Sequence, residues 1–185
     1  ILPFFRKKNF HFIKGDIRDK AALERAVQGK DVIIHLAAIV GYPACKENPS
    51  LAQSTNVDGT RNLAEVISKG QYVLFGSTGS NYGALVDTIC TEETPLNPVS
   101  LYGETKTEAE KILMQTGQAT AYRFATAFGL SPRLRLDLLI NDLTHQGVKQ
   151  RYMVIYEADF MRTFIHVHDI ARSFLFAIDN RAATQ

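Results

Sequence analysis

The stretch Asp31-Val-Ile-Ile-His-Leu-Ala-Ala38 is an almost continuous apolar run. Such a run is typical of a strand that is buried on both faces of a parallel sheet. Downstream, residues Leu51–Lys69 follow a helical pattern that ends at Gly70, and Tyr72–Phe75 is a second short apolar run. The sequence around residue 31 therefore predicts a strand, a crossover helix and a parallel strand.

The same alternation continues in both directions from this unit. Asp19 is suited to cap one helix and Ser100 another, and Gly29 and Gly117 stand where those helices should end. The predicted helices are Lys20–Gln28, Leu101–Gln115 and Asp169–Ile178, and the other predicted strands are Phe10–Ile13, Ala121–Ala127, Met153–Tyr156 and Phe164–Val167. This order predicts an α/β fold, a doubly wound parallel sheet with helices on both faces.

The composition excludes several classes of protein. The chain has 185 residues, of which 45% are hydrophobic, and its 21 Lys and Arg against 19 Asp and Glu give a net charge of only +2. We therefore expect no nucleic-acid partner. The longest apolar run, Val32–Tyr42, contains His35 and is too short to cross a bilayer, so no membrane partner is expected. The first residues lack the order of a signal peptide, which favours a cytoplasmic location. Cys45 and Cys90 form neither a disulfide framework nor a metal motif.

Parallel sheets bind ligands beyond the carboxyl ends of their strands. Four segments are expected there, namely 14–16, 36–40, 76–80 and 125–129. Three of the four are small and polar or contain glycine. Close approach of a flat ligand is one reading of this pattern, and ordinary turns are the other.

Tyr102-Gly-Glu-Thr-Lys106 is the most informative segment for chemistry. Residues four apart share one face of a helix, and Lys106 lies in the otherwise apolar stripe of this one. An ammonium near the Tyr102 phenol would lower its pKa and make it an acid/base group. A lysine with a buried stem and a solvated head is the alternative. Upstream, Ser77 and Thr78 end a predicted strand and could hydrogen-bond a substrate beside the phenol.

Six motifs in order then resemble a known family. They are Gly15-Asp-Ile-Arg-Asp, His35-Leu-Ala-Ala, Asn56-Val-Asp-Gly-Thr, Ser77-Thr-Gly-Ser-Asn-Tyr-Gly, Tyr102-x-x-x-Lys106 and Arg162-Thr-Phe-Ile-His-Val-His-Asp. Together they look like the extended short-chain dehydrogenase/reductases, specifically the NAD-dependent nucleotide-sugar epimerase/dehydratase family. The resemblance implies a Rossmann-like fold and an NAD(P)-dependent epimerase or reductase that acts on a nucleotide sugar. NAD is the expected cofactor with NADP not excluded, and a homodimer is a possible assembly.

The resemblance also implies a role for individual residues. Thr78, Tyr102 and Lys106 match the catalytic positions, with Lys106 also binding the nicotinamide ribose and tuning the tyrosine. The matches to cofactor-binding positions are Asp16, Ile17, Leu36, Ala37, Ala38, Asn56, Ser77, Tyr102 and Lys106. The matches to substrate-binding positions are Ser80, Thr126 and Arg162, of which the guanidinium of Arg162 suits a nucleotide diphosphate. No metal site is expected.

The chain departs from the family pattern at its ends. The family opens with a glycine-rich strand–turn–helix that holds the pyrophosphate, and no G-x-x-G-x-x-G occurs here. We therefore expect residues 1–130 to be a partial dinucleotide-binding Rossmann domain without its first βαβ unit. Residues 131–185 are expected to be part of the substrate-binding region, with a returning sheet segment. For this chain alone, weak or no NAD binding is expected.

Two positions bear on the reaction. Dehydratases of the family carry Asp-Glu directly after the catalytic threonine, where this chain has Gly79-Ser80, so sugar dehydration by that route is not expected. Thr126 stands where many 4-epimerases have asparagine. Two other functions stay open: a reductase or dehydrogenase of a non-nucleotide carbonyl compound, and a catalytically inert cofactor-sensing or scaffold protein.

Simple structural roles are expected for the remaining polar residues. His35 is interpreted as a hydrogen-bonded core histidine, and His166 with His168 as a surface or hydrogen-bonded pair. Asp169 is expected to cap the last helix, and Asp58 to lie on the polar face of a long one. Arg133 and Arg135 could reach a phosphate, but their alternation with leucine equally fits a solvated face.

Overall fold

The computed structural model describes residues 4–84, 89–156 and 158–184. Its centre is a parallel sheet of β1 (Val32–His35), β2 (Tyr72–Thr78) and β3 (Ala119–Phe124), in the order β1-β2-β3. A second parallel pair is formed by β4 (Thr126–Phe128) and β5 (Phe164–His166). The predicted α/β class with a parallel sheet is confirmed.

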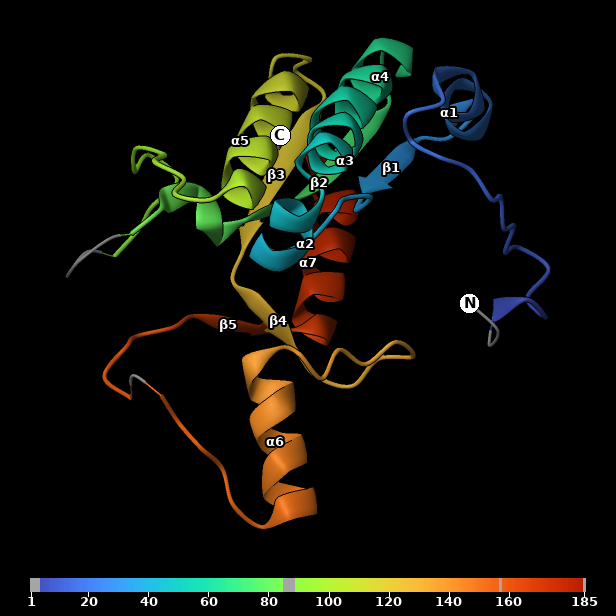
Figure 1. Cartoon of the computed structure of the whole chain (residues 1–185). Helices are drawn as coiled ribbons and strands as arrows, with labels where there is room; N and C mark the ends of the chain where they lie inside the picture. The colour runs from blue at the N-terminus through green and yellow to red at the C-terminus, as the bar shows by residue number, and fades with distance from the viewer. Residues whose placement is uncertain (1–3, 85–88, 157, 185) are drawn as a thin grey trace.

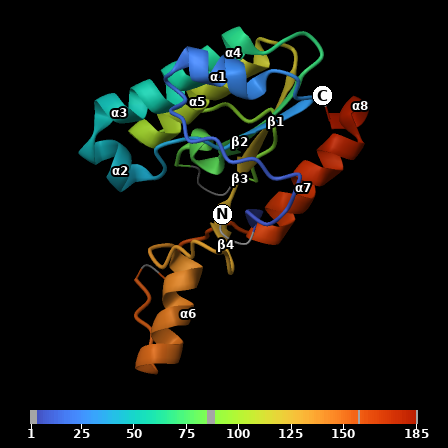
Figure 2. The ribbon, with the colours of Figure 1, turned by 90° about the vertical axis from the view of Figure 1, so that its right-hand side faces the viewer.

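The helices form layers on the two faces of the main sheet. One layer contains α1 (Lys20–Val27), α4 (Gly59–Val66) and α5 (Leu101–Met114), and α7 (Val167–Asp179) lies on the other side of the sheet (Figures 1 and 2). Shorter segments are α2 (Tyr42–Glu47), α3 (Pro49–Gln53), the π-helical η2 (Ser54–Asp58), the 3₁₀-helical η3 (Gly79–Tyr82) and α8 (Arg181–Thr184). Helix α6 (Leu139–Gln150) extends away from the sheet beyond β4 (Figure 1).

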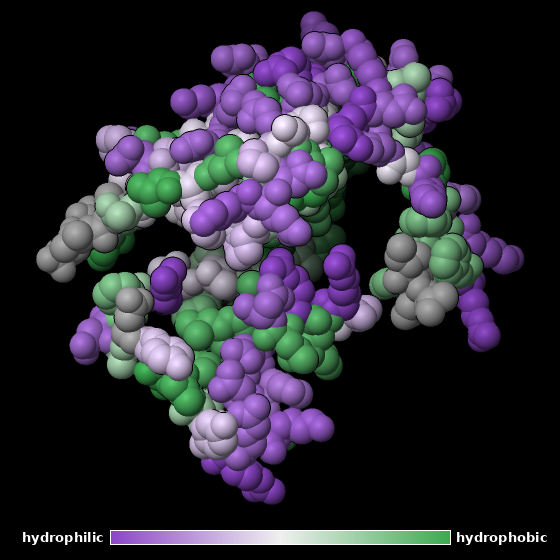
Figure 3. Space-filling view, viewed as in Figure 1, coloured by the Kyte–Doolittle hydropathy of each residue, from purple (hydrophilic) through white to green (hydrophobic). Residues whose placement is uncertain are grey.

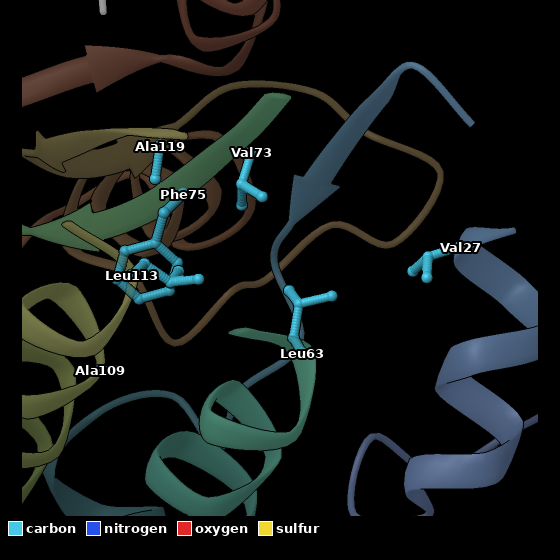
Figure 4. Close-up of a cluster of buried hydrophobic side chains, with 7 residues drawn as sticks. All are labelled: Val27, Leu63, Val73, Phe75, Ala109, Leu113 and Ala119. Atoms are coloured by element: carbon cyan, nitrogen blue, oxygen red, sulfur yellow. The ribbon is translucent and has the colours of Figure 1, made fainter. Parts of the chain in front are cut away.

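The alternating residues of β2 explain why its first four positions, Tyr72–Phe75, are all apolar. Val73 and Phe75 point to the face covered by α5, where they meet Leu113 and Ala109 (Figure 4). Tyr72 and Leu74 point to the opposite face, where the core contains Phe174 and Ala177 of α7. A strand with helices on both sides has no polar face, because successive side chains point to opposite faces.

The predicted helix ends depend on local chemistry and are confirmed. The carboxylate of Asp19 accepts from the backbone N–H of Ala22, and the hydroxyl of Ser100 accepts from that of Gly103 at 3.2 Å. Gly29 and Gly117 follow the two helices with φ of 68° and 65°, a conformation that favours glycine.

Two predicted strands are wrong. Residues Phe10–Ile13 and Met153–Tyr156 are described and are in neither helix nor strand. Apolar character alone does not make a strand, because a strand also needs a neighbour for its backbone hydrogen bonds. In the described part of the chain, β1 pairs with β2 only, and the side chains of Phe12 and Ile13 stay 51% and 69% exposed.

Other predicted elements have different boundaries. The predicted helix Leu51–Lys69 consists of α3, η2 and α4 and ends at Val66, because Ile67 adopts an extended conformation. The predicted strand Ala121–Ala127 is divided into β3 and β4, which belong to different sheets. The N-cap of α7 is His166 rather than Asp169, since its side chain accepts from the N–H of His168 at 3.2 Å. Helices α2 and α6 were not anticipated.

The surface is divided between hydrophilic and hydrophobic regions. In Figure 3 the upper helical layer is mostly hydrophilic, whereas hydrophobic patches gather lower in the view, around β4, β5 and α6. Exposed apolar side chains there include Leu130, Leu136 and Leu139. None of the helices in the described residues has the length and apolar character that crossing a bilayer requires.

Candidate active site

The first turns of α5 hold Tyr102 and Lys106 at the carboxyl edge of the sheet. Lys106 is only 3% exposed, and its Nζ lies 3.9 Å from the ring centroid of Phe75 on β2. A solvated lysine head would show much more exposure, so the structure favours a lysine whose charged end is inside the protein. Tyr102 is half-buried one turn earlier.

Thr78 reaches the same place from the sheet. It is the last residue of β2 and is 8% exposed, and its Oγ1 accepts from the N–H of Ser80 at 3.2 Å. The Thr78 side chain lies near enough to the Tyr102 phenol to lower the pKa of that phenol. The structure therefore brings Thr78 and Tyr102 together, with Lys106 one helical turn further along α5.

Glycine at position 103 permits this close contact. A Cβ on Gly103 would lie 3.0 Å from the carbonyl oxygen of Ser80 and 2.9 Å from the Cβ of Pro98. These are shorter than ordinary contacts, so a side chain here would push the start of α5 away from η3. The glycine between the tyrosine and the lysine thus sets how near the helix comes to Thr78.

The pKa of Tyr102 differs from the sequence-based expectation. Burial raises it above the usual value of 10, while the Thr78 side chain and the charge of Arg135 act in the opposite direction. Lys106 is not among the groups that shift it. The expectation that Lys106 lowers the tyrosine pKa is wrong for this arrangement, because loss of water around the phenol has the larger effect.

The pKa of Lys106 is shifted more strongly. Burial lowers it from 10.5 to about 7, and the negative charge of Glu110 on the next turn partly opposes this shift. A lysine side chain with this pKa is present both as charged ammonium and as neutral amine near neutral pH. Its titration therefore falls in the range in which an acid/base centre usually works.

Arg135 was considered from the sequence as a residue that could reach a phosphate, but its effect on Tyr102 was not predicted. Its charge favours the phenolate of Tyr102, and its guanidinium is held by the carboxylate of Asp137 through an Nε–Oδ1 contact of 3.1 Å. The sequence feature that could have indicated this arginine is the aspartate two residues after it, in the segment that follows β4. The alternation with leucine fitted a solvated face equally well.

Four of the predicted cofactor residues line one cleft. Asp16, Ile17, Leu36 and Ala37 belong to the lining of a cleft of about 380 Å³ beside β1. Arg18 holds the pKa of Asp16 at about 2, through side-chain and backbone hydrogen bonds, so this carboxylate is charged at neutral pH. Glycine at position 76 lets Leu36 lie over the end of β2, because a Cβ there would be 2.7 Å from Leu36 Cδ2.

The other predicted cofactor residues are placed differently. The amide of Asn56 is buried and binds both backbone groups of Ile39, with its Oδ1 2.7 Å from the N–H and its Nδ2 3.0 Å from the carbonyl oxygen. The hydroxyl of Ser77 donates to Glu110 at 2.5 Å. Both side chains are therefore engaged within the protein, and Ala38 is partly buried outside the cleft lining.

The predicted substrate residues lie at the surface. Ser80 is exposed on η3, Thr126 is exposed on β4, and Arg162 is exposed just before β5. Pairing of β4 with β5 brings the last two into adjacent segments, since Thr126 is opposite Phe164. Within the described residues, neither Thr126 nor Arg162 forms a hydrogen bond or ion pair with Thr78, Tyr102 or Lys106.

The core interpretation of His35 is confirmed. It is 4% exposed and its Nε2 is 2.9 Å from Thr60 Oγ1, whose own proton goes to the carbonyl of Asn56. The Nε2 of His35 is therefore the donor. Burial, assisted by the charge of Lys106, lowers its pKa to about 3. The backbone N–H of His168 donates to Nδ1 of His166, so the two residues are a hydrogen-bonded pair, which is one of the two interpretations given above.

Known proteins resemble the chain over nearly its whole length. It matches the NAD dependent epimerase/dehydratase family over residues 3–185. A UDP-glucose 4-epimerase 2 of Oryza sativa subsp. japonica is 38% identical over 109 residues, which are 57% of this chain and 27% of that protein. A probable UDP-glucuronate 4-epimerase of Rhizobium meliloti is 32% identical over 184 residues, covering 91% of this chain and 52% of that protein.

A solved structure of a related enzyme is also similar to this chain in its fold. The UDP-glucuronic acid 4-epimerase of Bacillus cereus, crystallised with UDP-glucuronic acid and NAD, superposes with a TM-score of 0.84 at 26% identity. The superposition covers 97% of this chain and 59% of that one. This likeness confirms the Rossmann-like fold. The chain spans about half the length, or less, of the curated relatives named here.

Proposed function

Because the chain belongs to the NAD-dependent epimerase/dehydratase family, we propose that it carries the reaction centre of an epimerase that acts on a nucleotide sugar. The proposed substrate class is a UDP-linked hexose, and the proposed cofactor is NAD. The meeting of Thr78 and Tyr102 at the sheet edge, one helical turn from buried Lys106, is the observation that carries this proposal.

The cleft beside β1 is suited to one end of a dinucleotide. It has apolar walls from Leu36 and neighbouring residues, and a charged carboxylate at Asp16 for a ribose or an adenine edge. Close packing of Leu36 on Gly76 keeps this wall near the end of β2. Asp16, Ile17, Leu36 and Ala37 are the residues that would hold the cofactor there, and NAD would supply the acceptor and donor of a hydride.

The acid/base step belongs to Tyr102. As a phenolate, its Oη takes the proton of a sugar hydroxyl, and as a phenol it returns the proton to the product. The hydroxyl of Thr78 and the charge of Arg135 favour the phenolate, against the effect of burial. Lys106 contributes positive charge inside the protein, in a proportion that depends on pH near neutrality.

Epimerisation fits the chain better than dehydration. Water loss from a sugar needs an additional acid and base next to the reacting carbons, and Thr78 is followed by Gly79 and Ser80. On the substrate side, we assign the diphosphate to Arg162 and sugar hydroxyls to Ser80 and Thr126, which are all exposed. The homodimer and the cytoplasmic location remain predictions.

Product analysis tests this proposal. The intact gene product is incubated with NAD and UDP-glucose, the sugar is followed by proton NMR, and NADH by absorbance. We expect an isomerised UDP-sugar without net NADH formation. Net consumption of NADH with a carbonyl substrate would instead identify a reductase, and NAD binding without turnover of any UDP-sugar would identify a non-catalytic protein.

Replacing the proposed acid/base group gives a second test. Tyr102→Phe should lower turnover by about 10²–10⁴-fold while leaving NAD affinity within a factor of about three, since only proton transfer is removed. Tyr152→Phe is the matched control, because that tyrosine is 60% exposed and distant in sequence from the site. A Tyr102→Phe variant with the wild-type rate would refute the assignment.

A further inference from the structure

Glu110 is a buried acid that the proposed reaction does not use. It lies on α5, one turn after Lys106, and is only 5% exposed. Its Oε2 accepts from the hydroxyl of Ser77 at 2.5 Å and from the amide of Asn81 at 3.0 Å. A carboxylate buried to this degree needs partners, and here the partners lie at the end of β2 and in η3.

The other oxygen of Glu110 is bound by an arginine. Oε1 accepts from Arg123 Nε at 3.0 Å and from Arg123 Nη2 at 2.6 Å. Arg123 belongs to β3, and its Nη1 also donates to the Tyr82 hydroxyl at 3.1 Å. The carboxylate is therefore neutralised and oriented by the neighbouring strand, which fixes which oxygen faces the end of β2.

The two groups bound by Oε2 flank Thr78. Ser77 precedes Thr78 directly, Asn81 follows it by three residues, and the amide of Asn81 also donates to Ser77 Oγ at 3.0 Å. Both ends of the segment 77–81 are thus hydrogen-bonded to the same carboxylate, that of Glu110. That carboxylate belongs to the helix that carries Tyr102, so one side chain ties the threonine segment to the tyrosine helix.

We propose that Glu110 is a positioning residue, which holds segment 77–81 so that Thr78 meets Tyr102 in the geometry the reaction needs. This inference rests on the proposed function of Thr78 and Tyr102. The Glu110 carboxylate bonds to Ser77, Asn81 and Arg123, and its charge also raises the pKa of Lys106. The positioning role is the part of its effect that passes through Thr78, and an effect through Lys106 would persist when Thr78 is replaced.

A double-mutant cycle separates this role from a merely structural one. Glu110→Gln keeps the volume and one acceptor oxygen, but its NH₂ group must face either the Arg123 or the Asn81 donors. We expect kcat for UDP-glucose to fall about tenfold or more, with KM changed less than about threefold. In a Thr78→Val background, Glu110→Gln should have no further effect on kcat, because the interaction through which it acts is already lost.

Two variants serve as controls. Glu108→Gln removes an exposed carboxylate from the same helix and should leave kcat unchanged. Leu113→Ala removes a fully buried side chain from α5 and measures how far general destabilisation alone lowers kcat. If Glu110→Gln lowers kcat no more than Leu113→Ala does, or if its effect adds fully to that of Thr78→Val, the positioning role is refuted.

Amide hydrogen exchange provides a readout that does not need turnover. The N–H of Ser80 is protected by Thr78 Oγ1, so release of the segment should speed its exchange. We expect at least tenfold faster exchange in Glu110→Gln than in Leu113→Ala. If the wild-type protein turns over no UDP-sugar, the proposed function fails, while equal exchange in the two variants would overturn the positioning role itself.

Discussion

At the scale of single residues, the most unusual feature is a lysine ammonium inside the protein. Lys106 is 3% exposed, and its pKa is lowered from 10.5 to about 7. One pKa unit corresponds to about 1.4 kcal/mol, so burying this charge at acidic pH costs up to about 5 kcal/mol of stability.

Lys106→Met should therefore stabilise the protein in a pH-dependent way. Below pH 7 both folded and unfolded states carry the ammonium, and the cost of burying it is complete. Between pH 7 and 10.5 the unfolded state binds the proton and the folded state does not, so wild-type stability rises with pH. The gain in the free energy of unfolding should be a few kcal/mol at pH 6 and less than half of that at pH 9, measured by urea unfolding.

Lys111→Met supplies the comparison on the same helix, because Lys111 is exposed. We expect its free energy of unfolding to follow that of the wild type at both pH values. A Lys106→Met gain that is absent, or equal at pH 6 and pH 9, would show that the ammonium is solvated.

His35 should make the protein sensitive to acid. Its folded-state pKa of about 3 is below the usual 6.5, so only the unfolded state gains this proton between those values. The free energy of unfolding has its full value above pH 6.5. It falls as the pH decreases to 3, and His35 accounts for up to about 5 kcal/mol of this loss. His35→Gln should lose less stability than the wild type over this range in urea unfolding.

The corresponding control is His145→Gln, at an exposed position on α6. Its loss of stability between pH 6.5 and 3 should equal that of the wild type. If His35→Gln is as acid-sensitive as His145→Gln, His35 takes up its proton in the folded state and the description of the core is wrong.

At the scale of elements, the contact between α5 and η3 decides whether the site forms. At Gly103 there is no room for a Cβ beside the Ser80 carbonyl and Pro98. Alanine normally favours a helix over glycine by about 1 kcal/mol. At this position the added Cβ would clash with the backbone of Ser80, which cannot move aside easily. Glycine should therefore be more stable than alanine here.

Gly103→Ala should thus destabilise the protein by about 1–3 kcal/mol, the usual cost of overpacking. It should also lower turnover, because Tyr102 is carried away from Thr78. Thermal unfolding and the UDP-glucose assay measure the two effects. Glu104→Ala, one residue along on the exposed side, should leave both close to wild type. A Gly103→Ala protein that is more stable than wild type would contradict the packing described.

Local signals explain which elements could be predicted from the sequence. Helix α5 was predicted to within a residue, because Ser100 caps its start and the glycine at 117 follows its end. Phe10–Ile13 was wrong, because strand formation depends on a pairing partner that no local pattern reports. The division of residues 121–127 into two strands was missed for the same reason, since β4 pairs with the distant β5.

The site could be predicted in part. The four-residue spacing placed Tyr102 and Lys106 on one helix face, and the strand order placed Thr78 near them. The sign of the tyrosine pKa shift was wrong because burial is a property of the folded chain. The effect of Arg135 on Tyr102 and the Glu110–Arg123 pair were not predicted, because the two members of each pair are 33 and 13 residues apart in the sequence.

At the scale of the whole molecule, we propose that the 185-residue chain holds only part of a dinucleotide site. The cleft beside β1 offers a carboxylate and apolar walls, but the chain has no glycine-rich turn whose backbone N–H groups could bind a pyrophosphate. Titration calorimetry of this chain with NAD should therefore show no binding in the micromolar range. Micromolar affinity would mean that other residues of this chain hold the phosphates.

In the proposed reaction, Thr78 and Tyr102 act on a sugar whose hydride leaves one carbon and returns to the same carbon. UDP-glucose with deuterium at C4 tests this directly in the intact gene product with NAD. We expect a UDP-sugar of inverted C4 configuration that retains its deuterium, formed about 10²–10⁴-fold more slowly by the Tyr102→Phe variant. Loss of the label to water, or inversion at the wild-type rate in Tyr102→Phe, would refute this role of the centre.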